Sequence, residues 1–187
     1  MKKVLFSLAL IVAGSAAFAQ VNKGQFLVGG NVSFATSKQA DADDDFRTTS
    51  FNVSPNAGYF FIDQLAGGLR VNLNTFKTKA AEDATTTFVV APFARYYFLP
   101  AAEKINVFAD ASYGFGSTGT VNKVSINQFS IMAGPAIFLT PNTALEFALG
   151  YTSQGGERWE NLAGDVKRNN TIGVNVGFQI HLGNAKK

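Results

Sequence analysis

The sequence contains no cysteine and only one histidine, and these two shortages exclude several kinds of chemistry. Without cysteine the chain can form no disulfide, no thiolate metal site and no cysteine nucleophile. A single imidazole cannot build a multi-histidine metal centre. We therefore expect no metal site and no bound cofactor, and we do not expect the protein to be an enzyme.

Charge is also scarce, because Asp, Glu, Lys and Arg make up 16% of the 187 residues, against roughly 25% in ordinary soluble proteins. The length suits one domain, and the eighteen Phe, eighteen Gly and five Pro do not fit a disordered or fibrous chain. After Gln20 no run approaches the roughly eighteen apolar residues that a membrane-spanning helix needs. A helical membrane protein is therefore excluded, and an ordinary soluble enzyme is disfavoured.

The N-terminus has the pattern of a secretory signal. Two lysines precede an apolar run over residues 4–12, and Ala17-Phe18-Ala19 then supplies small residues at the two positions that signal peptidase reads. We predict a cleaved signal peptide over residues 1–19 and an exported domain over residues 20–187. Cleavage removes those two lysines, which leaves fourteen basic and thirteen acidic residues and a net charge near zero. We therefore expect no nucleic-acid partner.

The mature chain alternates apolar and polar residues with a period of two, which predicts strands. The eight alternating segments lie near residues 25–34, 50–62, 65–76, 86–98, 104–116, 126–139, 143–153 and 169–182. Short connections at 62–64, 99–103 and 140–142 alternate with longer polar ones at 37–49, 77–85, 117–125 and 154–168. This arrangement predicts an all-β fold, an eight-stranded antiparallel up-and-down transmembrane β-barrel with turns in the periplasm and loops outside.

Alternate residues of a strand point to the same side, and we call each such set of positions a parity. One parity of these strands is apolar and carries no charge, so we predict that it faces lipid. Its aromatic residues should form two girdles at the membrane interfaces, where rings contact hydrocarbon and headgroups together. The periplasmic girdle would contain Phe26, Tyr59, Phe61, Tyr96, Phe98 and Phe178, and the outer girdle Phe34, Phe51, Phe88, Tyr113, Phe115, Phe129 and Tyr151. Two prolines of this parity, Pro92 and Pro135, cannot donate to a ladder, so we expect a bulge at each.

The opposite parity is rich in Asn, Ser, Gln and Gly, as suits the narrow interior of a small barrel. It also contains a lumen charge cluster, whose members we predict to be Arg70, Arg95, Asp110 and Glu146. Two positive and two negative charges can neutralise each other as a salt-bridged plug. We expect Arg95 and Asp110 to pair on adjacent strands. The alternative is that these groups form the selectivity filter or gate of a pore.

Three further features allow a structural and a functional interpretation. His181 lies inward near the periplasmic rim and should make an interior or rim hydrogen bond, although it could act as a base with Ser33 or Ser112. The acidic residues between Asp41 and Asp45 fit a solvated loop better than a calcium site or a bridge of divalent ions to lipopolysaccharide. Trp159 should pack over the barrel mouth, although it could anchor a partner.

Residues 58–69 (GYFFIDQLAGGL), 92–98 (PFARYYF) and the final strand 175–182 (NVGFQIHL) carry a family resemblance. The mature chain resembles the small outer-membrane β-barrel domain proteins of the Bacteroidota type, similar in architecture to outer-membrane protein A and outer-membrane protein X. The resemblance implies the outer membrane of a diderm bacterium and assembly by periplasmic chaperones and the barrel-assembly machinery. The final strand departs from the assembly signal by ending in Leu182 rather than Phe.

These observations predict an integral outer-membrane barrel, monomeric, in contact with membrane lipid and lipopolysaccharide. Its expected role is structural or in surface interactions, with a lumen plugged by polar and charged side chains. Two alternatives remain open, a small gated pore or transport protein and, less favoured, a lipid-modifying enzyme.

Overall fold

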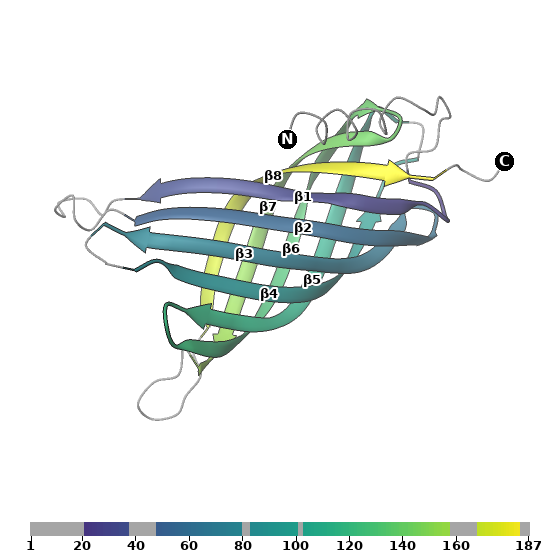
Figure 1. Cartoon of the computed structure of the whole chain (residues 1–187). Helices are drawn as coiled ribbons and strands as arrows, with labels where there is room; N and C mark the ends of the chain where they lie inside the picture. Colours follow the sequence, from purple (N-terminus) through teal and green to yellow (C-terminus); the bar gives the residue numbers. More distant parts are fainter. Residues whose placement is uncertain (1–20, 38–47, 80–82, 101–102, 158–167, 184–187) are drawn as a thin grey trace, which may run out of the picture.

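The computed structural model describes residues 21–37, 48–79, 83–100, 103–157 and 168–183. Eight antiparallel strands form a closed barrel in which each strand pairs with the next and β8 pairs with β1 (Figure 1). The strands are β1 (Phe26–Ser37), β2 (Thr48–Ile62), β3 (Leu65–Thr78), β4 (Thr85–Tyr97), β5 (Ile105–Gly119), β6 (Lys123–Thr140), β7 (Thr143–Gly156) and β8 (Asn169–Leu182). The predicted all-β, up-and-down architecture is confirmed. No helix in the described ranges is long and apolar enough to cross a membrane.

The prediction of a long connection between β5 and β6 is wrong. Residues 117–125 were expected to form a loop, but β5 and β6 continue through most of this segment and leave only residues 120–122 between them. The pairs Ser117 with Ser125 and Thr118 with Val124 extend the ladder. The expectation failed because Ser and Thr are common in loops, yet they also pair well across strands where one face is wet.

The prolines do not produce the expected bulges. At Pro92 the β4–β5 pairing stops after Val90 and resumes at Phe93 in the same register. At Pro135 the β6–β7 pairing is interrupted in the same way, between Ala133 and Ala136. Proline removes one donor from the ladder, whereas a slip of one residue would move every later side chain to the other face. The sheet therefore loses local pairs and keeps its register.

The true register shifts lie beside the short turns. One falls between Phe60 and Ile62, before the turn at residues 63–64, where Gln64 has a φ of 68°. The other falls between Phe138 and Thr140, before the turn at residues 141–142. An extra residue at a strand end bends the chain into the turn without disturbing the alternation of the strand behind it.

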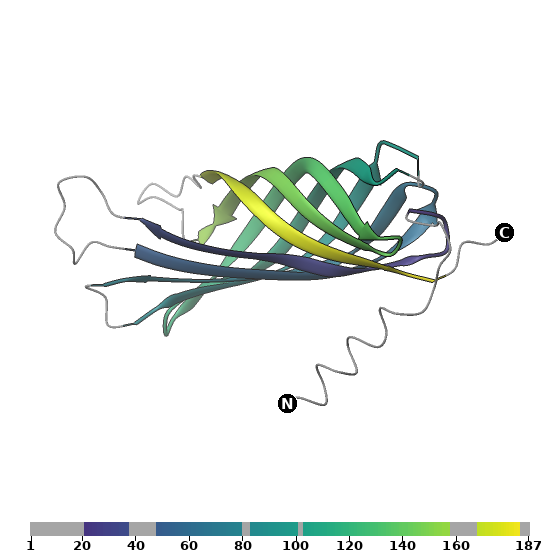
Figure 2. The same ribbon diagram turned by 90° about the horizontal axis from the view of Figure 1, so that it is seen from above.

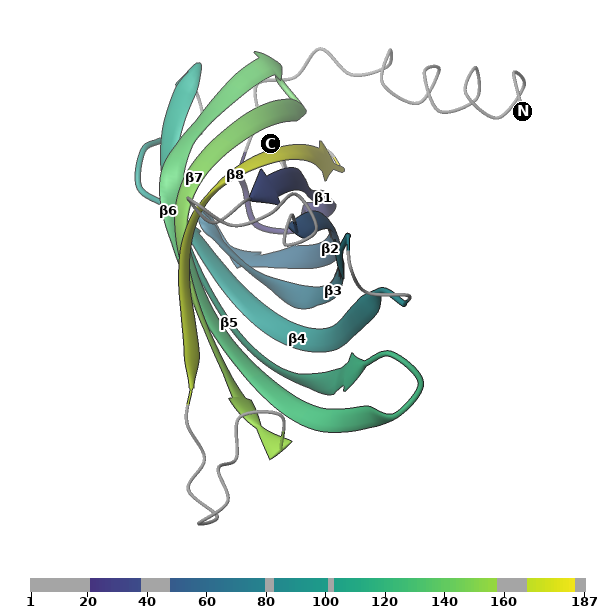
Figure 3. The ribbon, with the colours of Figure 1, turned by 90° about the vertical axis from the view of Figure 1, so that its left-hand side faces the viewer.

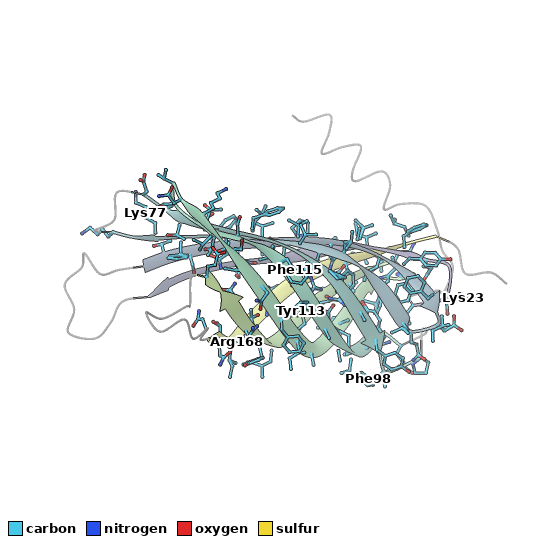
Figure 4. All side chains as sticks on the ribbon, turned by 90° about the horizontal axis from the view of Figure 1, so that it is seen from below. Lys23, Lys77, Phe98, Tyr113, Phe115 and Arg168 are labelled. Carbon is cyan, nitrogen blue, oxygen red and sulfur yellow. The ribbon has the colours of Figure 1, made fainter. Side chains whose placement is uncertain are left out.

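The outer wall is apolar. Its side chains include Phe115 at 65% exposure and Leu149 at 62%, and neighbouring rings such as Tyr113 and Phe115 meet edge to face with centroids 5.2 Å apart. Figure 4 places Phe98 toward the short-turn end, and Tyr113 and Phe115 farther along the wall. Every proposed girdle residue whose side chain is described lies on this outer face, at least partly exposed. The side chain of Phe34 lies outside the described part.

The interior of the short-turn half is filled by an apolar cluster, which the sequence pattern did not predict. It consists of Val21, Leu27, Phe60, Ala66, Phe93, Tyr97, Phe108, Ala136, Phe138, Ala144 and Ala148, all nearly or fully buried. Val21 comes from the segment before β1, and its carbonyl oxygen accepts a hydrogen bond of 2.8 Å from the backbone N–H of Gln64. This segment thereby contributes to the packing at the base of the barrel.

Candidate functional site in the barrel lumen

Asp110 is the centre of a buried ion network. Its two carboxylate oxygens accept hydrogen bonds of 2.8 Å each from the two terminal nitrogens of Arg70. Its Oδ2 also accepts a 3.0 Å bond from Nε of Arg95. Arg95 and Asp110 lie directly opposite each other on β4 and β5, as the sequence pattern predicts. The bidentate geometry is the strongest form of an arginine–carboxylate contact.

The network continues across the lumen. Nη1 of Arg95 donates to both carboxylate oxygens of Glu146 on β7, at 2.8 and 2.9 Å. The hydroxyl of Tyr97 donates a 3.2 Å bond to the same carboxylate. Because β4 and β7 are not neighbours in the barrel, Arg95 and Glu146 connect separate parts of the wall through its interior.

All four charged side chains are shielded from water, with exposures of 3% or less. The guanidinium of Arg95 lies 4.5 Å from the ring centroid of Phe108, and that of Arg70 lies 4.9 Å from the ring of Phe93. These cation–π contacts join the charges to the apolar cluster below them. A buried charge is tolerated when it is paired and hydrogen-bonded, and here each of the four has an oppositely charged partner.

Above the network, toward the long-loop end, the lumen widens into a cavity of about 580 Å³, which we call the cup. Its inward-facing lining is dominated by amide and hydroxyl side chains, and Arg70 is the charged residue among its described lining positions. Part of this lining is bonded to itself, as in the 2.9 Å bond from Gln154 to Gln128 and the 2.7 Å contact between Thr87 and Thr118. The inward-facing wall of the cup is thus mainly polar, and among its described lining residues only that arginine is charged.

Several buried polar atoms of the lumen have no hydrogen-bond partner among the described residues. At the cup these are Nδ2 of Asn72, Oδ1 of Asn74 and Nε of Arg70. Buried polar groups in folded proteins are ordinarily satisfied by protein, water or a ligand. The wall of the cup therefore contains donors and an acceptor that are unpaired in the described structure.

His181 does not make the expected interior side-chain hydrogen bond. Its ring packs among Phe138, Phe60 and Tyr97 with centroid distances of 5.3, 5.7 and 5.8 Å, and neither ring nitrogen has a hydrogen-bond partner in the described structure. The expectation assumed that the inward parity is polar throughout, whereas its short-turn half is aromatic. Ser33 and Ser112 line the cup instead, so the structure does not bring either of these two serines to the histidine.

Other residues that the sequence suggested lie outside the described residues. These are the signal peptide at 1–19, the acidic residues from Asp41 to Asp45, and Trp159. Conversely, Tyr97 belongs to the ion network but was missed by sequence reasoning. Its signal was the pair Tyr96 and Tyr97, since consecutive residues of a strand point to opposite faces and one ring must face inward.

Comparison with known proteins agrees with this architecture. The model of a family described as the outer membrane protein beta-barrel domain matches residues 5–183. No curated protein is significantly similar to the chain. The chain belongs to the outer membrane protein beta-barrel domain family, which places it in the outer membrane.

Two solved structures share the fold. The crystal structure of Neisserial surface protein A is 16% identical with a TM-score of 0.57, and the match covers 84% of this chain and 99% of that one. The outer membrane protein OprG from Pseudomonas aeruginosa is 10% identical with a TM-score of 0.50, and the match covers 88% and 98%. At these identities the likeness concerns the fold alone.

Proposed function

We propose that this outer-membrane barrel is a monomeric, non-conducting protein with a structural or surface-interaction role, whose lumen is plugged. The orientation follows the rule for such barrels, with short turns in the periplasm and long loops outside. The cup would then open toward the cell exterior. We further propose that the chain is exported by its cleaved signal peptide and contacts lipopolysaccharide in the outer leaflet.

The contact between Arg95 and Glu146 through the interior carries the proposal. An ion crossing the barrel would have to displace paired charges that are out of contact with water, and then pass the aromatic cluster below them. Eight-stranded barrels already have interiors roughly filled by side chains. The ion network and the apolar cluster therefore both oppose conduction.

Planar bilayer recordings test the proposal. Purified, folded protein should give no single-channel steps. A variant with alanine at all four charged positions, Arg70, Arg95, Asp110 and Glu146, separates the two barriers. The apolar cluster below is intact in this variant, so small steps would show that the network is the main barrier, and continued silence would show that the cluster alone is sufficient. The folded state of each sample is checked by its gel mobility before and after boiling. Regular steps from the unmodified protein would contradict the plug and favour the gated pore.

The small gated pore remains the second candidate, because the cup reaches down to Arg70 and supplies a polar vestibule on one side of the network. In that case, neutralising the four charges should change the permeability of cells to small polar solutes. We do not propose an enzyme, since His181 is buried among aromatic rings. The His181→Ala variant is expected to leave the lipid composition of the envelope unchanged.

We also propose that periplasmic chaperones and the barrel-assembly machinery insert the protein. The support is the final strand, in which Val176, Phe178 and Ile180 alternate with inward residues up to the end of β8 at Leu182. Depletion of the assembly machinery should prevent the appearance of the heat-modifiable form. An unchanged yield of folded protein would contradict this route.

A further inference from the structure

The barrel is not paired along the whole length of β1 and β8. Their ladder begins at Phe26 with Leu182 and ends at Val32 with Val176. Beyond this point residues 33–37 still pair with β2, and residues 169–175 still pair with β7. The two strands no longer pair with each other, so the long-loop half of the barrel has a seam, which we define as the gap between residues 33–37 and 169–175.

The figures show how the seam arises. Figure 3 views the barrel from its long-loop end, where β8 bends away from β1 after lying beside it in the more distant half. In Figure 2 the same two strands diverge toward the long-loop end. The views agree with the register, because the strands separate where their pairing stops.

Side-chain exposure also changes at the seam. Ile172 and Val174 are 73% and 72% exposed, whereas Val176 and Phe178, farther along the same face of β8, are each 44% exposed. A Cβ atom added to Gly173 would meet no heavy atom within 4 Å. The beginning of β8 is therefore open on the side where β1 would otherwise lie.

The seam adjoins the cup. The cup lining includes not only inward residues of β8, such as Asn169 and Asn175, but also the outward residues Ile172 and Val174. A polar interior and an apolar outer surface thus meet at one edge. In a lipid bilayer, unpaired strand edges are costly unless other groups satisfy them, so the polar head group of a ligand would be favoured where the seam borders the cup.

The chemistry of the cup limits the kind of ligand. Amides and hydroxyls dominate its inward-facing lining, and the charge of Arg70 is already compensated by Asp110. In the described part of the chain, Nδ2 of Asn72, Oδ1 of Asn74 and Nε of Arg70 are unpaired and buried in the cup wall. The two asparagines would supply one donor and one acceptor to a ligand when their side chains turn toward the cavity. Such a set suits a neutral, hydroxyl-rich group better than a phosphate, which would seek uncompensated positive charge.

We propose that the cup binds an amphiphile from the outer leaflet, with an uncharged, hydroxylated head group in the cup and an apolar chain that leaves through the seam. The chain would lie against Ile172 and Val174. The inference deepens the proposed surface role and rests on it, because the cup must be a closed end rather than part of a passage.

The absence of cysteine permits a direct test. If the β1–β8 register were continued, Ser33 would lie opposite Asn175. The Ser33→Cys/Asn175→Cys variant can therefore close the seam by a disulfide when oxidised. The matched control is Asn31→Cys/Gly177→Cys, because these positions are already opposite each other in the paired part. Both variants are embedded in lipid nanodiscs, and binding of a tritiated long-chain alkyl glucoside is measured above the retention of empty discs.

The proposal predicts saturable binding to the unmodified protein, a loss of at least tenfold when the seam disulfide forms, recovery on reduction, and no effect of oxidation in the control. The folded Asn72→Leu/Asn74→Leu variant, with the seam left free, should also bind at least tenfold more weakly. Absence of saturable binding, or full binding with the disulfide formed, would overturn the proposal.

An alkyl phosphate of equal chain length serves as the second probe. Tighter binding of this anion than of the glucoside would overturn the assignment of an uncharged head group. Bilayer conductance separates the two proposals. Steps from unmodified protein refute the plug, whereas a silent barrel without saturable glucoside binding refutes the amphiphile site alone.

Discussion

Replacing Asp110 by asparagine should destabilise the barrel more than any other single change of similar size. The side chain keeps its shape but loses its charge, and its new amide nitrogen must face the N–H groups of Arg70 or Arg95. Three charge-assisted hydrogen bonds of 2.8, 2.8 and 3.0 Å are affected. Among the described residues Arg70 then has no carboxylate partner, and Arg95 keeps only Glu146. Breaking a buried ion pair from one side costs about 3–5 kcal/mol, and we expect a loss of that size.

The assay is urea unfolding of the purified protein in lipid vesicles, with the folded fraction read from gel mobility without heating. Asp83→Asn is the matched control, since the same chemical change at this exposed position should alter the free energy of unfolding by less than about 0.5 kcal/mol. Adding Arg70→Leu to Asp110→Asn leaves one cation and one anion. This double variant should be more stable than the sum of the two single effects predicts, by about 1 kcal/mol or more. An Asp110→Asn variant as stable as the control would refute the reasoning.

Three further predictions concern packing and the seam. Val21→Ala should lower the unfolding free energy by about 1–3 kcal/mol because Val21 is fully buried, whereas Val121→Ala, at a position 83% exposed, should have almost no effect in the same urea assay. Gly116→Ala should reduce the yield of folded barrel, because a Cβ there would overlap the backbone of Phe88, whereas Gly173→Ala should fold normally in the gel assay. In a hydrogen-exchange measurement, the backbone amides of residues 169–175 that point away from β7 should exchange fast, because they have no ladder partner on β1. Equal protection of all amides along β8 would contradict an open seam.

The architecture could be predicted from the sequence because its determinants are local. Alternation is visible residue by residue, and an exposed apolar face such as Val107, Ala109 and Ala111 follows directly from it. The turns at residues 63–64 and 141–142 are marked by Asp, Pro and Asn. Local signals are ambiguous where one residue type suits both a strand and a loop, and this explains the error at residues 117–125.

The interior could be predicted only in part. The pairing of Arg95 with Asp110 is a contact between neighbouring strands, so strand parity and order suffice to suggest it. Contacts through the lumen, such as Arg95 with Glu146, depend on strand tilt and barrel shear, which alternation does not reveal. The aromatic packing around His181 was missed for another reason, because the inward parity changes from polar to apolar along the barrel axis. The seam is likewise a property of strand bending, and its residues alternate like any others.

The central claim is that the apolar parity contacts lipid while the polar parity faces the lumen. Single cysteines at Ala109, Ala111, Ser112 and Tyr113 of β5 can carry a spin label in reconstituted vesicles. Collision with oxygen, which concentrates in the hydrocarbon, and with a water-soluble nickel chelate is then measured at each position. The structure predicts that labels at Ala109, Ala111 and Tyr113 collide mainly with oxygen, and that the label at Ser112 does not. A profile without this alternation, or with the chelate reaching the apolar parity, would contradict the account.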